Sequence, residues 1–188
     1  MDQTEKHKKT CKRYNITGHA HSLTFSCFRN RPFMNSDLAC NFLAQAINKA
    51  RQEHNFHLWA YIFMPEHVHL LIYPTEAEYS ISDILTSIKQ SVSRRVFIHL
   101  RRNAPEKMKY FETGQDGIKY KFWQDGGGYD KNITGSEVIF NIADYIHRNP
   151  VRRGLVESPL DWHWSSAGEW DKEGTGPISI DRKFFPIV

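Results

Sequence analysis

Two apolar segments, separated by only three residues, constrain the fold of this chain more than any other feature. Residues 57–63 are almost wholly apolar, and residues 67–73 form a second run rich in Val, Leu and Ile. Apolar runs of this length are typical of strands that are covered on both faces. Because only Met64, Pro65 and Glu66 join the two runs, we predict an antiparallel hairpin within a sheet.

The second strand of this predicted hairpin carries two histidines. Side chains alternate along a strand, so His67 and His69 share one face while the apolar residues between and after them point to the other. Two imidazoles side by side make half of a divalent-metal site. A His-x-His pair also arises by chance, so on its own it leaves metal binding a hypothesis. The pair His19 and His21 has no apolar run before it, and we do not expect it to bind metal.

A helix predicted over residues 136–149 carries the other candidate site residues. Its apolar positions recur at helical spacing: Val138, Ile139, Ile142 and Ile146. Thr134 and Glu137 have the spacing of a capping box, and Pro150 is expected to end the helix. Tyr145 and Asn149 are four residues apart and therefore lie on one face. A tyrosine at such a position is most often a packing residue, but the pair would also suit a metal held by the two histidines.

The remaining pattern predicts an α+β fold. We expect strands and helices in the order strand, helix, strand, strand, helix, strand, which fits a ferredoxin-like antiparallel sheet with helices packed on it. The additional elements are a first strand at 22–28, a helix at 37–54, a long helix at 80–102 with a capping box at Ser80 and Asp83, a mobile loop at 103–119, and a fourth strand at 120–124 followed by a glycine turn.

Composition sets broad limits on the protein class. A chain of 188 residues with 40% hydrophobic residues suits one globular domain. We expect this domain at 14–170, between a flexible basic arm at 1–13 and a C-terminal tail at 171–188. The net charge of +4 and pI of about 8.9 are compatible with nucleic-acid binding. Three cysteines without zinc-type spacing suit the cytoplasm, and no apolar run reaches the ~20 residues of a membrane helix.

Taken together, the motifs resemble those of the single-tyrosine HUH transposases, named for two histidines around a hydrophobic residue. They are most similar to the REP-associated tyrosine transposases. The similar segments follow the family's order across residues 14–170. They are residues 64–71, residues 88–90 with Arg94 and Arg95, residues 122–124, residues 145–151 and residues 162–167.

This resemblance implies a fold, a mechanism and a ligand set. It implies the HUH endonuclease fold and a divalent metal, Mg²⁺ or Mn²⁺, held by His67, His69 and the amide oxygen of Asn149. It implies that Tyr145 is the nucleophile, which forms a 5′-phosphotyrosine and releases a 3′-hydroxyl. The implied substrate is single-stranded or hairpin DNA, which the enzyme cuts and rejoins as a transposase located with DNA in the cytoplasm.

The basic residues of the helix at 80–102 are candidates for DNA binding. We expect Lys89, Arg94 and Arg95 to flank the catalytic face and to contact phosphates, although such charges are often only solvated. Glu66 is expected to stabilise a turn or bind a backbone amide rather than a metal.

Two other functions stay open beside a cleaving enzyme. The alternative is a hairpin-binding module of the same fold that does not cleave, which would not need His67, His69, Tyr145 and Asn149 together. A metal-dependent phosphohydrolase without a covalent step would not need Tyr145. We favour a monomer, with a homodimer as the alternative.

Overall fold

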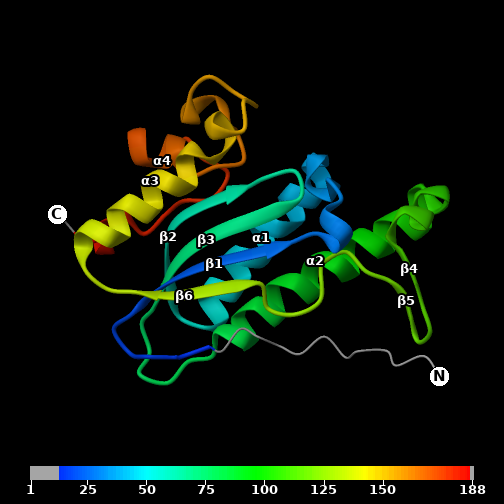
Figure 1. Cartoon of the computed structure of the whole chain (residues 1–188), viewed down its shortest axis with the longest axis horizontal. Coiled ribbons are helices and arrows are strands. Elements are labelled where there is room, and N and C mark those ends of the chain that lie inside the picture. Colours follow the sequence, from blue (N-terminus) through cyan, green and yellow to red (C-terminus); the bar gives the residue numbers. More distant parts are fainter. Residues whose placement is uncertain (1–12, 187–188) are drawn as a thin grey trace, which may run out of the picture.

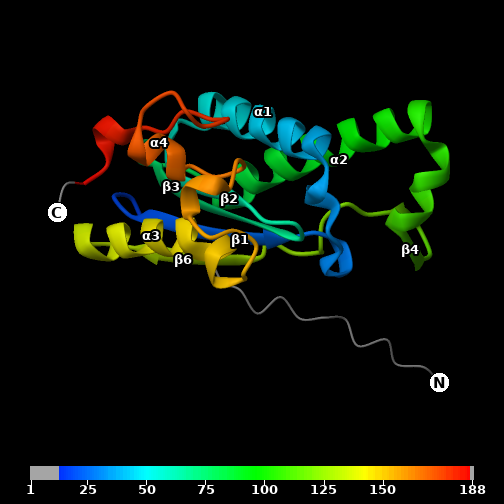
Figure 2. The same ribbon diagram turned by 90° about the horizontal axis from the view of Figure 1, so that it is seen from above.

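The computed structural model describes residues 13–186. Its centre is an antiparallel four-stranded sheet in the order β2-β3-β1-β6 (Figure 1). Two helices cover one face and a third helix lies on the other (Figure 2). This arrangement confirms the predicted α+β, ferredoxin-like fold. The elements of this core are β1 (Ala20–Ser26), α1 (Asp37–Glu53), β2 (Phe56–Phe63), β3 (His67–Pro74), α2 (Ile81–Asn103), β6 (Tyr129–Ile133) and α3 (Ser136–Arg152).

The predicted hairpin is confirmed as β2 and β3, and the alternation along β3 decides what each face holds. Val68, Leu70 and Ile72 are fully buried in the larger core cluster beneath α1 and α2. Leu71 points the other way, into the smaller cluster beneath α3. His67 and His69 share the face of Leu71, because residues two apart in a strand point the same way. The candidate metal ligands therefore lie on the α3 face.

The fourth strand of the sheet is not the predicted segment 120–124. Phe122 and Trp123 are buried in the core, and Trp123 forms no strand ladder with β1 but only an isolated bridge with Cys27, the residue after β1. The position beside β1 belongs instead to β6, whose sequence YDKNI is mostly polar. The prediction failed because a short aromatic run that anchors a loop in the core looks like a strand by hydrophobicity alone.

The segment expected to be a structureless loop after α2 has regular structure. It contains a 3-10 helix, η3 (Pro105–Phe111), and a separate two-stranded hairpin of β4 (Glu112–Gln115) and β5 (Ile118–Tyr120). Phe111 anchors this excursion by stacking against Phe122. The hairpin lies at the end of α2, away from α3 (Figure 1).

Helix α3 begins at Ser136 as predicted, but its N-terminal cap and its C-terminal end differ from the prediction. Gly135 is the N-cap, so Thr134 and Glu137 form no capping box. The helix also continues through Pro150 to Arg152. A proline removes only one backbone N–H donor from a helix. The carbonyl oxygen of Pro150 still accepts a hydrogen bond, from the backbone amide of Leu155. In the apolar stripe Ile139 and Ile146 are buried, whereas Val138 is exposed. The extra turn matters because it carries two arginines.

Helix α2 begins where the sequence indicated. The Ser80 hydroxyl accepts a hydrogen bond from the backbone amide of Asp83, as an N-cap does.

No helix within the part of the chain that the structure describes is long and apolar enough to cross a membrane.

The C-terminal residues cover the outer edge of β2. Asp181 accepts a hydrogen bond from the amide of Leu58, and its own amide donates to the carbonyl of Leu58. Ile178 is buried in the larger core cluster. The segment expected to be a tail therefore packs on the domain as far as it is described. Arg13, the last residue of the expected basic arm, pairs with Asp130, and the rest of that arm lies outside the described residues.

Candidate active site

The two histidines of β3 converge at their Nε2 atoms. The Nε2 of His67 lies 3.0 Å from the Nε2 of His69, and the rings are perpendicular. Each Nδ1 has a partner on its other side, the Glu66 carboxylate at 3.0 Å for His67 and the Thr24 hydroxyl at 2.8 Å for His69. An ionised carboxylate only accepts, so the Nδ1 of His67 donates to Glu66 and its Nε2 keeps a free lone pair.

Burial keeps both imidazoles neutral at neutral pH. Burial and, to a smaller extent, the nearby His67 together lower the pKa of His69 to about 4. Burial also lowers the pKa of His67, although Glu66 opposes that shift. Neutral imidazole is the form that binds a metal.

The histidine pair fits an octahedral ion. Two adjacent ligands of such an ion, each at about 2.1 Å, are about 3.0 Å apart, which matches the observed spacing of the Nε2 atoms. Across residues 13–186 no three His, Cys, Asp or Glu side chains gather as in closed structural zinc sites. The donor set therefore suits an ion that keeps positions open for substrate oxygens.

Helix α3 brings Tyr145 to the histidines. The Tyr145 ring meets the His69 ring edge-on, with 6.2 Å between centroids, and it is 47% exposed. Asn149, one turn later, is buried and its amide donates to the Tyr145 carbonyl. The structure thus places Tyr145 beside His69, with Asn149 in the next turn of α3, while the chemical role of each of the predicted site residues stays a prediction.

The last turn of α3 adds two site residues that we did not predict. The Arg152 guanidinium lies 4.8 Å from the centre of the Tyr145 ring, in cation–π geometry. Arg153 pairs with the carboxylate of Glu66 and so ties α3 to the start of β3. The sequence does contain a signal for them, because both arginines closely follow the tyrosine motif. We did not use it because we expected the helix to end at Pro150.

Thr24 was also missed, and no local signal marks it. Thr24 stands opposite His69 in the register of β1 and β3. That pairing, which brings its hydroxyl to the Nδ1 of His69, depends on strands that are far apart in the sequence.

The three expected DNA-binding residues do not flank this site. Helix α2 covers the opposite face of the sheet, so the predicted position of Lys89, Arg94 and Arg95 is wrong. Lys89 donates to backbone carbonyls of the loop at 124–126, and burial lowers its pKa. Arg95 lies over the Phe42 ring of α1, whereas Arg94 is exposed. Whether any of them contacts DNA stays a prediction.

Two other histidines, His21 and His147, have structural partners instead of a place in this site. His21 is fully buried on the α2 side of the sheet, where its two ring nitrogens meet Asp130 and the Tyr79 hydroxyl, each at 2.8 Å. His147, two residues after Tyr145, points away from it and meets the Ser166 hydroxyl at 2.8 Å. Replacing either would remove buried hydrogen bonds, which destabilises a fold.

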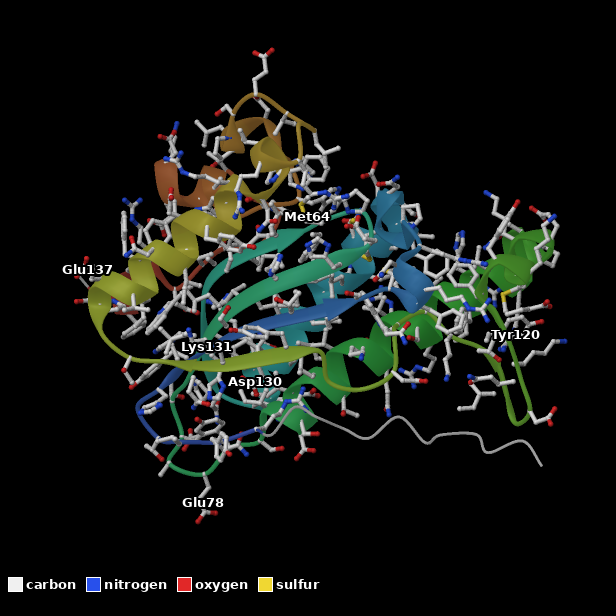
Figure 3. The ribbon with its side chains drawn as sticks, in the orientation of Figure 1. Met64, Glu78, Tyr120, Asp130, Lys131 and Glu137 are labelled. Carbon is white, nitrogen blue, oxygen red and sulfur yellow. The ribbon has the colours of Figure 1, made fainter. Side chains whose placement is uncertain are left out.

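We expect Glu66→Ala to lower the affinity for Mn²⁺ by about 10–100-fold, the range for residues that orient a metal ligand. The physical reason is that the Glu66 carboxylate fixes the tautomer and direction of the His67 ring. Titration calorimetry would measure the affinity. Glu78→Ala is the matched control. Met64 lies next to the site, since its amide donates to the His67 carbonyl, and the exposed Glu78 lies far from Met64 on the other side of the molecule (Figure 3). Equal Mn²⁺ affinities for both variants would mean that Glu66 does not orient a metal ligand and that its role is limited to the ion pair with Arg153.

Comparisons with known proteins assign the chain to a family. Residues 15–149 match the family model described as "Transposase IS200 like". A REP-associated tyrosine transposase of Escherichia coli is 26% identical over 168 residues, covering 89% of this chain and 87% of that protein. A Haemophilus influenzae protein, assigned by name to the REP-associated tyrosine transposases, is 28% identical over 137 residues, covering 69% of this chain and 73% of that protein.

A solved structure has the same fold. The structure described as a REP-associated tyrosine transposase bound to a REP hairpin superposes with a TM-score of 0.69, with 22% identity, over 92% of this chain and 90% of that chain. The likeness confirms the predicted HUH endonuclease fold. With the family match over most of the core, the chain belongs to the IS200-like transposase family.

Proposed function

We propose that this protein is a metal-dependent single-stranded DNA endonuclease and strand-transferase that acts on hairpin-containing DNA through a covalent 5′-phosphotyrosine. The observation that supports this most directly is the Tyr145 ring, half-exposed against His69 of a converging histidine pair. A REP hairpin is the ligand in the similar solved structure. A hairpin with single-stranded flanks is therefore the substrate we infer here.

The chain supplies a nucleophile and the groups that would hold a metal ion beside it. His67, His69 and the amide oxygen of Asn149 would hold Mg²⁺ or Mn²⁺, which when bound polarises the scissile phosphate and offsets the charge that develops on it. The Tyr145 oxygen attacks phosphorus, the bond from phosphorus to the 3′-oxygen breaks, and the phenol proton ends on the released 3′-hydroxyl. Arg152, beside the ring, would pair with the negatively charged phosphate.

The reverse step rejoins DNA without an energy cofactor. A 3′-hydroxyl attacks the phosphotyrosine, forms the new phosphodiester and returns the Tyr145 phenol. The energy of the broken phosphodiester is kept in the phosphotyrosine, so cutting and joining are nearly balanced. This reversibility is what separates a strand-transferase from a hydrolase.

We also propose that the protein works as a monomer. The ring of Tyr145 packs on His69 of the same chain, so the site needs no residue from a second copy. A homodimer is the alternative, and light scattering with and without hairpin DNA would distinguish the two.

One experiment separates the proposed enzyme from the two alternatives. Labelled single-stranded hairpins from the DNA that flanks the gene are incubated with the protein in Mg²⁺ or in chelator, and then run on a denaturing gel. A metal-dependent protein–DNA adduct is the expected result. Cleavage without an adduct would indicate a phosphohydrolase, and binding without cleavage would indicate a binding module.

For the α2 residues we expect a contribution from Arg94 alone. Arg94 is exposed, whereas Lys89 and Arg95 already have protein partners. If Arg94 contacts a phosphate of single-stranded DNA, Arg94→Ala should lower the slope of log affinity against log salt by about 0.7. Lys89→Ala should leave the slope unchanged. Hairpin affinity measured across a salt series tests this, and an unchanged slope for Arg94→Ala would mean that α2 is only a solvated helix.

A further inference from the structure

Only half of the sheet face that carries the histidines is covered. Helix α3 packs on β2 and β3 and on Ala20 and Ile133 at one end of β1 and β6, and within residues 13–186 no helix covers the rest of β1 and β6 on this face (Figure 1). Residues opposite each other in an antiparallel pair point to one face. The register places five side chains on this uncovered half, here called the open sheet face: Ser22, Thr24, Ser26, Tyr129 and Lys131.

The open sheet face is continuous with the candidate active site through Thr24. The Thr24 hydroxyl meets the Nδ1 of His69 on one side, and Thr24 stands opposite Tyr129 on the other. Strands are about 4.8 Å apart, so Tyr129 lies two strands, about 10 Å, from His69. Nucleotides adjacent to a phosphate bound at the histidines would reach this distance.

The charge on the open sheet face suits a nucleic acid. None of its five side chains is acidic, and Lys131 is exposed. Asp130, the neighbouring acid in β6, points to the opposite face, where its buried carboxylate meets Arg13 and His21 (Figure 3). The alternation of β6 therefore leaves a cation, hydroxyls and one aromatic ring on the side of the active site.

Tyr129 is the feature that points to unpaired bases. Its side chain is 54% exposed, and no aromatic neighbour stacks on it within the part of the chain that is described. Exposed aromatic rings beside basic groups are how single-strand binders hold bases, since every base offers a π-face. In a duplex those faces are covered by neighbouring base pairs.

We propose that the open sheet face binds the single-stranded nucleotides that flank the scissile phosphate, with a base stacked on Tyr129 and a backbone phosphate paired with Lys131. This inference rests on the proposed function for the location of the scissile phosphate. The occupant is single-stranded DNA rather than the hairpin stem, because the ring needs a base that is free to stack.

The test measures binding without chemistry, in the full chain carrying Tyr145→Phe and in the absence of metal. The probes are fluorescein-labelled oligodeoxyadenylate and its duplex with oligothymidylate, followed by anisotropy. Tyr129→Thr removes the ring but keeps a residue that favours strands. We expect it to weaken single-strand binding by roughly 5- to 150-fold, the equivalent of about 1–3 kcal/mol for one stacked base. Tyr129→Phe should retain the affinity of the parent.

Matched controls are available on distant elements. Tyr110→Thr removes a tyrosine of similar exposure, 52%, from η3, and it should leave affinity unchanged. Lys131→Ala should lower the salt slope by about 0.7, whereas Lys49→Ala on α1, whose ammonium pairs with Glu53, should not. Thermal melting of each variant confirms that it folds.

The outcomes separate this inference from the proposed function. Parent-like single-strand affinity in Tyr129→Thr would overturn the stacking site, and so would an equal loss for the duplex. Adduct formation is measured separately, in the chain that keeps Tyr145. If that chain forms the adduct but Tyr129→Thr does not weaken single-strand binding, the proposed function stands and the stacking site is wrong. If single-strand binding depends on Tyr129 but the chain with Tyr145 never forms an adduct, the stacking site stands and the proposed enzymatic function is wrong.

Discussion

Tyr145→Phe is expected to abolish both DNA cleavage and the covalent adduct while leaving the fold intact. The substitution removes one oxygen, which is the atom proposed to attack phosphorus. The contacts of Tyr145 with His69 and Arg152 are made by its ring, which phenylalanine keeps. The hydroxyl has no hydrogen-bond partner within residues 13–186, so the free energy of unfolding should change by no more than about 0.5 kcal/mol.

A denaturing gel with labelled hairpin DNA measures this directly. Loss of both product and adduct, with hairpin affinity and melting temperature unchanged, is the expected combination. Tyr110→Phe is the matched control, because it removes the same oxygen from an exposed tyrosine on η3 and should cleave normally. An adduct that persisted in Tyr145→Phe would assign the nucleophile to another residue.

The parts of the fold that could be predicted are those that short segments determine. The hairpin of β2 and β3 follows from two apolar runs with a three-residue connection, and the shared face of His67 and His69 follows from strand alternation. The four-residue spacing of Tyr145 and Asn149 fixes their relation on α3 in the same way. These local relations, combined with the family resemblance, were sufficient to select the His67–His69 pair and Tyr145, which the structure brings together at the His69 ring.

What could not be predicted depends on packing between distant segments. The polar strand β6 places the Asp130 carboxylate against Arg13 and His21, and no pattern within β6 reveals those partners. The same holds for the face covered by α2, since an amphipathic helix indicates that it packs but not on which side of the sheet. Basic residues near a motif in sequence were therefore placed wrongly, whereas Arg152 and Arg153 were overlooked.

Removing either histidine of β3 is the second substitution with a large expected effect. His67→Ala or His69→Ala deletes one of two Nε2 donors that are only 3.0 Å apart, and each should eliminate metal-dependent cleavage. The loss should exceed the about 10–100-fold cost of removing an outer-shell partner such as Glu66. Asn149→Ala should weaken Mn²⁺ binding less, because a neutral amide oxygen is a poorer ligand than imidazole. Titration calorimetry with Mn²⁺, alongside single-turnover cleavage, measures both consequences.

The control for this experiment follows from the burial of the other histidines. The pair His19 and His21 is not expected to bind metal, but His21→Ala is a poor control because His21 contacts Asp130 and Tyr79 in the core, so its loss would disturb β1 and β6 themselves. His163 is exposed and lies beside Trp164, so His163→Ala removes an imidazole without opening the core. Normal cleavage in His163→Ala together with none in His67→Ala and His69→Ala would support the metal site. Metal-dependent cleavage that survived in both of the latter variants would mean that the ion binds elsewhere than at the two histidines of β3.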